Sequence, residues 1–311
     1  MKLDTLFFDT MVLKKVQWFL KNPKGGLILY GSKGLGKHLL ARFIAMQVLG
    51  VNEMEQLSFH LDFMEIHLQN QSIKVDDLEP VHKLVALTAV NAEKKVVVID
   101  DADKMTTVAQ NSLLKLLEDM NEKNLIILVC HRPILQTIHS RCQIMECYPS
   151  NSNNLFHYLT SKGLVVEELA LILANGCIGK YFTYCQREEY LRDIRSFFLG
   201  FSKNSKKELL TIFSMMKEKD KNNFFEKYAI EDIREFLQLL FEVLNEMLLR
   251  LSTKSEYRKE FSTFIDFEVA LQHTSIESII KSQQMVKEHL FRLERKSTYT
   301  KHDFFDLIRH L

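Results

Sequence analysis

Residues that interrupt helices are scarce in this sequence, which has four prolines and ten glycines among 311 residues. Their scarcity excludes a loop-rich, low-complexity chain and favours helical structure. An excess of one charge sign is also lacking, because 41 Lys and Arg residues face 40 Asp and Glu residues. This balance excludes a general basic field for binding nucleic acid, so any contact with DNA requires a local patch.

Cysteines are few and scattered along the chain. No two of them form a Cys-x-x-Cys pair, so a cysteine-based zinc site is not expected, and we predict no metal-binding residues. An odd number of cysteines, with no secretion signal in the first ten residues, is typical of the reducing cytoplasm. An apolar run long enough to cross a bilayer is lacking too, so we expect a cytoplasmic protein without membrane contact. The five are Cys130, Cys142, Cys147, Cys177 and Cys185.

The length and the apolar content of 46% indicate two or three domains with buried cores. Residues 1–150 alternate between apolar runs and helical periodicity, which predicts an α/β domain with a parallel sheet covered on both faces. A polar, turn-rich stretch at 148–154 marks its end. We expect a small helical unit at 151–200 and a separate helical domain at 201–311, with a charged linker at 203–207.

Short apolar runs predict the strands, and 3.6-residue periodicity predicts the helices. The expected strands are 27–30, 96–99, 125–129 and 144–147. The expected helices include 39–49, 76–91, 109–120 and 231–251, and the small helical unit is expected to break at Asn175, Gly176 and Gly179. The polar residues of 231–251 form one narrow stripe, which indicates a helix buried on most of its surface.

A glycine-rich loop follows the first expected strand. Gly31, Gly34, Gly36 and Lys37 fit the phosphate-binding pattern of Gly, four residues, Gly-Lys and then Ser or Thr. In such a loop the backbone N–H groups close around the phosphates, the Lys neutralises their charge, and the hydroxyl ligates Mg²⁺. Here His38 takes the place of the hydroxyl. The pattern predicts a degenerate nucleotide-binding loop with one metal ligand missing.

Two alternatives stay open for this loop. A chance match in an ordinary strand–turn–helix would show the same residues without any ligand. If the match is meaningful, Lys37 and the loop amides are able to hold phosphates without a metal, whereas the imidazole of His38 is a poor partner for Mg²⁺. No cofactor is certain from the sequence. ATP with Mg²⁺ is a possible one, but because His38 is a poor metal ligand we expect that this chain does not hydrolyse it.

Two carboxylates end the strand expected at 96–99. In a nucleotide site the first, Asp100, would hold Mg²⁺ through water, and the second position would polarise the attacking water. The second position is Asp101, which is one methylene shorter than the Glu usual there. A strand-end turn capped by Asp is the alternative interpretation, but the glycine loop in the same domain favours the nucleotide site.

Arg141 lies in the short sequence Ser140-Arg141-Cys142. A lone Arg is most often a solvated surface residue, so this triplet has no local meaning by itself. Its order and spacing relative to 100–105 and 111–119, however, resemble those of the clamp-loader subunits of bacterial DNA polymerase III, which belong to the AAA+ family. The resemblance covers about 25–148 and continues weakly through 174–181, which is similar to the family's Gly-rich lid helix.

This resemblance implies an AAA+ architecture with a P-loop α/β domain at 1–150, a small helical lid at 151–200 and a helical oligomerisation collar at 201–311. It implies that Arg141 reaches across a subunit boundary and stabilises charge in a neighbour's ATP site. The implied partners are gamma/tau-like and delta-like clamp-loader subunits in a hetero-oligomeric ring, and, through the ring, the sliding clamp and primed DNA.

The departures from the family pattern point to a member without motor activity. The family's motor subunits, gamma and tau, keep the hydroxyl of the glycine loop and hydrolyse ATP, whereas this chain has His38 and Asp101. The family's four-Cys zinc module has no counterpart in 50–62, and Cys130 stands where a small polar sensor is usual. We expect no intrinsic ATPase, although the chain would be a component of the DNA polymerase III holoenzyme.

Two other functions remain as alternatives. The first is an active motor subunit of the same family, in which Asp100 and water hold the metal despite His38. The second is a stand-alone nucleotide kinase or GTPase built on the same loop, which would lack a helical C-terminal third devoted to assembly.

Overall fold

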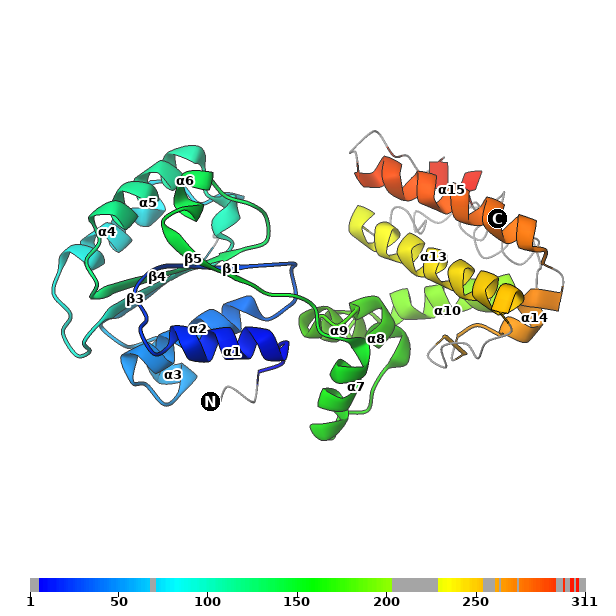
Figure 1. The fold of residues 1–311 in the computed structure, drawn as a ribbon, viewed down its shortest axis with the longest axis horizontal. Helices are drawn as coiled ribbons and strands as arrows, with labels where there is room; N and C mark the ends of the chain where they lie inside the picture. The colour runs from blue at the N-terminus through cyan, green and yellow to red at the C-terminus, as the bar shows by residue number, and fades with distance from the viewer. Residues whose placement is uncertain are drawn as a thin grey trace. The chain divides into compact units, whose positions relative to one another are not determined.

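The computed structural model (Figure 1) divides into two compact units, and each is considered by itself. The first unit comprises Met1–Leu164 and Asn175–Lys180, and the second comprises Val165–Ala174 and Tyr181–Leu311. The residues that the structure describes are 6–67, 71–202, 229–253, 261–262, 264–272, 274–294, 299, 303–304 and 306–307.

The linker expected at 203–207 lies outside the described residues. The division into 1–150, 151–200 and 201–311 stays a prediction.

A five-stranded sheet forms the centre of the first unit, and all of its pairings are parallel. Strands β1, β3, β4 and β5 confirm the four predicted runs, and the α/β class is confirmed with them. Strand β2 was not predicted, because its Phe-Met-Glu-Ile run is short, lies at the edge and is only half-buried. In spatial order the strands are β2 Phe63–Ile66, β3 Lys95–Ile99, β4 Asn124–Cys130, β1 Gly25–Tyr30 and β5 Cys142–Glu146.

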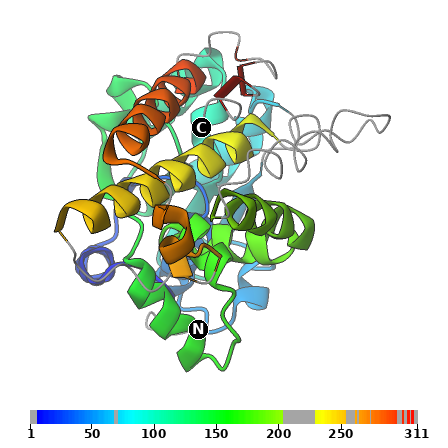
Figure 2. The same cartoon turned by 90° about the vertical axis from the view of Figure 1, so that its right-hand side faces the viewer.

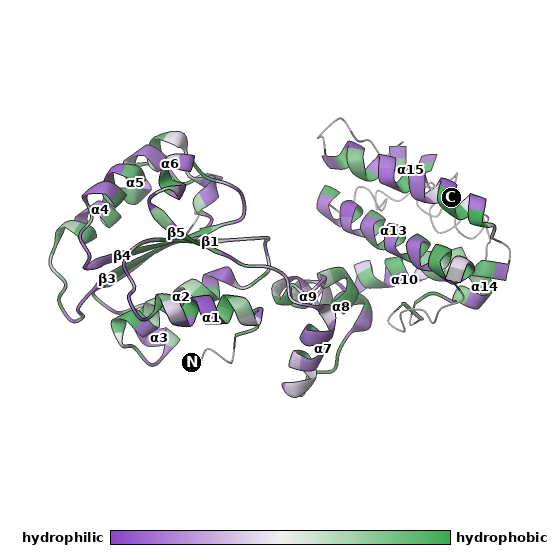
Figure 3. Cartoon of the chain, in the orientation of Figure 1, coloured by the Kyte–Doolittle hydropathy of each residue, from purple (hydrophilic) through white to green (hydrophobic). Residues whose placement is uncertain are grey.

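Helices cover both faces of this sheet (Figure 1). Successive residues of β1 alternate between two hydrophobic clusters: Leu27 and Leu29 belong to one, and Ile28 belongs to the other. A strand buried on both faces is typical of a parallel sheet, and in Figure 3 the central strands β3 and β4 are mostly in the hydrophobic colour. One face carries α1 Thr10–Phe19, α2 Lys37–Leu49 and α3 Met54–Leu57; the other carries α4 Glu79–Ala86, α5 Thr107–Asp119 and α6 Gln136–His139.

The helix predicted at 76–91 is wrong at its end. A 3₁₀ turn, η2 Asp76–Leu78, leads into α4, which stops at Ala86. The buried ammonium of Lys95 donates to the carbonyl oxygens of Leu84 and Leu87, so it caps the last turn. A contact from strand β3 therefore helps to end α4, although the helical pattern of apolar residues in the sequence continues beyond Ala86.

The segment beyond α4 is held by a buried carboxylate. Asp62 accepts hydrogen bonds from the backbone N–H groups of Val90, Asn91 and Ala92 at 2.8, 2.7 and 2.9 Å. Burial favours the neutral acid, but these three donors outweigh it and lower the pKa of Asp62. Because N–H groups that bind a carboxylate are not available to a helix, 90–92 cannot continue α4.

The second unit is helical in its described residues. The predicted helix at 231–251 is confirmed by α13, whose polar stripe is more exposed than its buried core positions. Helices α13 and α15 lie side by side (Figures 1 and 2). Besides α13 Ile230–Thr253, the helices are α8 Glu168–Ala174, α10 Glu188–Ser202, α14 Phe267–Gln272 and α15 Ile276–Glu294, while α7 Ser152–Ser161 belongs to the first unit and α9 Ile178–Cys185 begins there.

An ion pair joins α13 to the start of α10. The two guanidinium nitrogens Nη1 and Nη2 of Arg187 bind the carboxylate of Asp232 at 2.6 and 2.8 Å. The Tyr190 hydroxyl donates to the Asp232 carbonyl at 2.9 Å.

Among the described helices, none combines the length and apolarity needed to span a membrane.

The expected helix breaks are half confirmed. Asn175 and Gly176 separate α8 from α9, and both have positive φ, 44° and 76°. Gly179 does not interrupt a helix, because it is the second residue of α9. Its N–H donates to the Gly34 carbonyl at 2.8 Å, so the start of α9 rests on the glycine loop.

Asp62→Asn should lower the free energy of unfolding by about 1–3 kcal/mol at neutral pH, because the amide loses a charged acceptor and leaves buried N–H groups unpaired. The folded pKa lies below the unfolded one, so the contribution is present above the unfolded pKa and is lost as pH falls through the folded pKa. Urea unfolding from pH 7 downwards checks both. The exposed Asp76→Asn is the control, and equal losses in the two variants would contradict the assignment.

Candidate functional site

Four parallel strands end at one edge of the sheet, and the residues that follow them form the candidate site. The glycine loop follows β1, His67 follows β2, Asp100 follows β3 and His131 follows β4. The structure thus brings together all seven residues predicted for nucleotide binding, which are Gly31, Gly34, Gly36, Lys37, His38, Asp100 and Asp101. Arg141 does not join them.

Gly31 seats the loop against the residue that follows β5. Its φ is 152°, and a Cβ at this position would lie 2.2 Å from the carbonyl oxygen of Cys147. The Cys147 N–H donates to the Tyr30 carbonyl at 2.7 Å, which fixes the two backbones at this spacing. Gly34 and Gly36 also have positive φ, 88° and 83°, and Gly36 directly precedes α2.

The Lys37 ammonium is folded back onto its own loop. Only 2% of the residue is exposed, and Nζ donates to the carbonyl oxygens of Gly31 and Ser32 at 2.7 Å each. Burial lowers the pKa of Lys37, because the charged form loses hydration. A phosphate oxygen would be a stronger acceptor than either carbonyl, because it is ionised.

His131 links Lys37 to the strand-end carboxylates. Its Nδ1 lies 2.8 Å from Lys37 Nζ, and its Nε2 lies 3.0 Å from Asp101 Oδ1. An ammonium only donates, so we assign the proton of the neutral imidazole to Nε2, where it is donated to Asp101. Burial, together with the Lys37 charge, lowers the pKa of His131, which favours this neutral form.

His131 was not predicted as a site residue, and the sensor position was expected at Cys130. Cys130 is instead fully buried in the hydrophobic cluster on the α4–α5 face of the sheet. Side chains alternate along a strand, so the residue after Cys130 faces away from that cluster. The sequence feature that could have identified His131 as a site residue was its position directly after a predicted strand.

Asp101 is held by protein groups on both sides. Its Oδ2 pairs with Lys104 Nζ at 2.7 Å, and its Oδ1 faces His131. Burial favours the neutral acid, but Lys104 and His131 outweigh it and lower the pKa of Asp101. Its backbone is left-handed, with φ of 50°. A carboxylate engaged in this way is not available to orient an attacking water.

His38 faces a buried carboxylate that the sequence did not single out. Its Nε2 lies 2.6 Å from Glu65 Oε1, and Arg42 Nη1 lies 2.9 Å from Glu65 Oε2. His67 Nε2 lies 3.3 Å from the same Oε2. The hydrogen bond to Glu65 raises the pKa of His38, although burial opposes it. Glu65 lies in strand β2 and His67 directly follows it. Because β2 was not predicted, no pattern in the sequence marked either residue as part of the site.

The residues present fit a phosphate group but do not fit Mg²⁺. Lys37 and the glycine backbone supply the cation and the conformation that a phosphate needs. At the position of the metal-binding hydroxyl, however, the chain offers the imidazole of His38, already bonded to Glu65. Mg²⁺ requires oxygen ligands in near-octahedral order, so this donor set disfavours it. Hydrolysis of Mg-ATP on this chain is therefore not supported by the site.

Arg141 lies at the opposite edge of the sheet from the glycine loop. It directly precedes β5, and its neighbour Cys142 pairs with Gly26 near the start of β1. The five residue-to-residue steps from Gly26 to Gly31 span about 16 Å of extended strand, at 3.3 Å per step. Arg141 therefore cannot contact a ligand in its own loop.

The Arg141 guanidinium is exposed but held by its own chain. Its Nη2 lies 2.6 Å from Glu118 Oε1, and its Nη1 donates to the Thr137 carbonyl at 3.0 Å. It lines a cavity of about 420 Å³ together with Gly26 and Cys142. An exposed ion pair of this kind is worth little, so a stronger acceptor from another chain could replace Glu118.

Gly31→Ala should destabilise the first unit by about 3 kcal/mol or more, because its Cβ would meet a backbone oxygen that cannot move independently. Gly50→Ala is the control, since Gly50 also has positive φ, 69°, but has nothing within 4 Å of its Cβ position. We expect it to cost only about 1–2 kcal/mol, the price of a left-handed residue. Equal losses in urea unfolding would mean that the loop is not seated on Cys147.

Comparisons with known proteins match mainly the part of the chain that carries the sheet. The family model described as DNA polymerase III, delta subunit, matches residues 17–151. DNA polymerase III subunit delta' of Haemophilus influenzae is 25% identical over 208 residues, covering 60% of this chain and 64% of that protein. The subunit delta' of Pseudomonas aeruginosa is 33% identical over 137 residues, covering 39% and 42%. Replication factor C subunit 2 of Oryza sativa is 25% identical over 178 residues, covering 51% of each chain.

The chain thus spans less than two thirds of the length of these relatives. The matched region contains the glycine loop, the strand-end carboxylates and the Ser-Arg-Cys triplet. Over residues 17–151, the chain is therefore similar to clamp-loader subunits of DNA polymerase III.

Proposed function

We propose that this chain is a non-motor, delta'-like subunit of a bacterial replicative clamp loader. It assembles with gamma/tau-like and delta-like subunits in a hetero-oligomeric ring and supplies Arg141 to a neighbour's ATP site. Through that ring it takes part in loading the sliding clamp onto primed DNA. The name of the relatives, DNA polymerase III subunit delta', supports the subunit type.

The observation that carries the proposal is the distance between Arg141 and its own glycine loop. About 16 Å of strand lie between them, so the guanidinium has no reactive phosphate of its own chain within reach. The guanidinium is exposed beside a cavity, which supports a role in binding a partner's phosphate, to which a guanidinium can donate bidentately. Hydrolysis would then depend on assembly of the ring.

The engaged groups of the local site support the non-motor part of the proposal. Asp101 is paired with Lys104 and His131, and His38 is paired with Glu65. A motor site needs an oxygen ligand for the metal and a carboxylate that orients water. At the positions that would supply these two groups, His38 and Asp101 are already bonded to other residues of the chain. This favours a delta'-like subunit over a gamma/tau-like motor.

The isolated chain should show negligible ATPase activity, because neither the metal ligand nor the water-orienting carboxylate is available. Steady-state phosphate release with excess Mg-ATP checks this, and Lys37→Ala is the matched control for contaminating activity. Turnover that Lys37→Ala abolishes would instead favour the active motor subunit.

Arg141→Ala should lower the turnover of the one ATP site next to this subunit by about 10³-fold in the reconstituted complex, because charge on the transferred phosphoryl loses its guanidinium. Arg141→Lys should be nearly as inactive, since it keeps the charge but loses the planar fork. Glu118→Gln should retain activity, because it removes only the local partner of Arg141.

Single-turnover ATP hydrolysis by the assembled complex is the measurement, with thermal unfolding of each variant as the check on folding. Undiminished turnover of every site in the Arg141→Ala complex would show that the arginine has no role in trans.

A further inference from the structure

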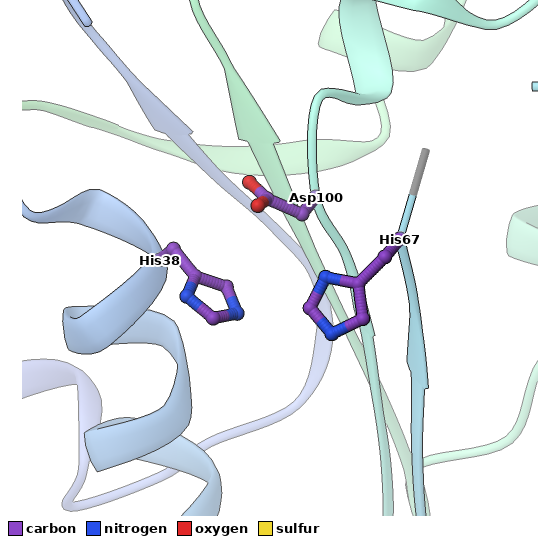
Figure 4. A group of neighbouring side chains, drawn as sticks. All are labelled: His38, His67 and Asp100. Carbon is purple, nitrogen blue, oxygen red and sulfur yellow. The ribbon is translucent and has the colours of Figure 1, made fainter. Parts of the chain in front are cut away.

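Two histidines and an aspartate meet beside the glycine loop (Figure 4). His38 lies at the start of α2, His67 directly follows β2 and Asp100 directly follows β3. One potential ligand atom from each of the three lies within 4.8 Å of the others. Figure 4 shows a ring nitrogen of His38 turned toward the His67 ring, with Asp100 close to both residues. Three elements far apart in sequence thus converge on one point.

The donor set of this cluster selects a particular class of cation. Imidazole nitrogen together with carboxylate oxygen is the usual set for Zn²⁺ and its neighbours in the first transition series. Mg²⁺ and Ca²⁺ prefer oxygen ligands only, so they are poor matches. The same substitution that removes a magnesium ligand from the loop, His38 in place of a hydroxyl, adds a zinc ligand.

Glu65 lies next to this cluster and contacts both of its histidines. Its Oε2 lies 3.3 Å from His67 Nε2, and its Oε1 lies 2.6 Å from His38 Nε2. A carboxylate that is hydrogen-bonded to ligating histidines fixes the orientation of their rings, as is common for the outer partners of metal ligands.

Glu65 is itself held in place by further contacts. Arg42 binds Glu65 Oε2 at 2.9 Å and also donates to the Ser58 hydroxyl at 2.9 Å and the Met54 carbonyl at 3.2 Å. The Glu65 side chain is only 9% exposed. Metal sites are commonly held in this way, with first ligands oriented by hydrogen-bonded neighbours. An ion pair on the exposed surface would not need these additional hydrogen bonds to hold its carboxylate.

We propose that His38, His67 and Asp100 bind one Zn²⁺-class cation, with Glu65 orienting the two histidines, at the place where an intact glycine loop would hold magnesium. The ion ties the end of β2 to the start of α2 and closes the metal side of the loop to Mg-ATP. This site goes beyond the proposed function and does not depend on it, because it needs neither nucleotide nor partner subunits.

The test uses the purified 311-residue chain, treated with a chelator and titrated with Zn²⁺ against a chromophoric competitor. One equivalent should bind to the wild type, and millimolar Mg²⁺ should not displace it. His67→Ala and His38→Ser should each weaken binding at least about 100-fold, and Glu65→Gln about 10–100-fold. His157→Ala is the matched control, because His157 is exposed on α7, and it should bind like the wild type.

A second readout identifies the ligands. Co²⁺ bound in place of Zn²⁺ should give the intense visible absorption of a four-coordinate nitrogen–oxygen site, and His67→Ala should abolish it. Melting curves in chelator check that the variants are folded, and His67→Asn replaces His67→Ala if the latter is not. The proposal is overturned if the wild type does not bind one equivalent, or if binding survives both His67→Ala and His38→Ser. ATPase assays play no part, so failure here leaves the proposed function untouched.

Discussion

Parallel pairing of all five strands is the constraint on which the candidate site depends. Because parallel strands share one direction, the residues that follow β1, β2, β3 and β4 meet at the same edge of the sheet. The same rule sends a residue that precedes a strand, such as Arg141 before β5, to the opposite edge. One topological rule therefore separates the glycine loop from the arginine, and this separation is why we propose that they serve the reactions of different subunits.

Charged groups at the loop are arranged in two closed sets of contacts. One runs from Lys37 through His131 to Asp101, and the other joins His38 and Arg42 through Glu65. Closed sets are expected for buried charges, because an unpaired charge loses hydration without compensation. A ligand must therefore exchange partners with the protein. The Lys37 side suits an anion, whereas the imidazole side suits a borderline cation, so the two halves of the site have different chemistry.

Local pattern was a good guide to some elements and a poor guide to others. Buried runs such as that of β4 were predictable, since continuous apolar residues are typical of a strand covered on both faces. The end of α4 was not predictable, because Lys95 and Asp62, distant in sequence, bind the backbone that would extend it. At the end of β4 the alternation of side chains decided that His131, and not Cys130, reaches the site.

The sequence by itself determined the α/β class, the glycine loop, the substitution of His38 for a hydroxyl and the strand-end carboxylates, because each lies in a short continuous segment with its own pattern. Only the tertiary structure decided what those residues touch. Glu65 and His67 lie in and after an edge strand with no clear signal, and they meet His38 because β2 pairs beside β3. A hydrogen bond or a metal ligand set depends on distance in space, and distance in space between residues 38, 67 and 100 is set by strand order rather than by local sequence.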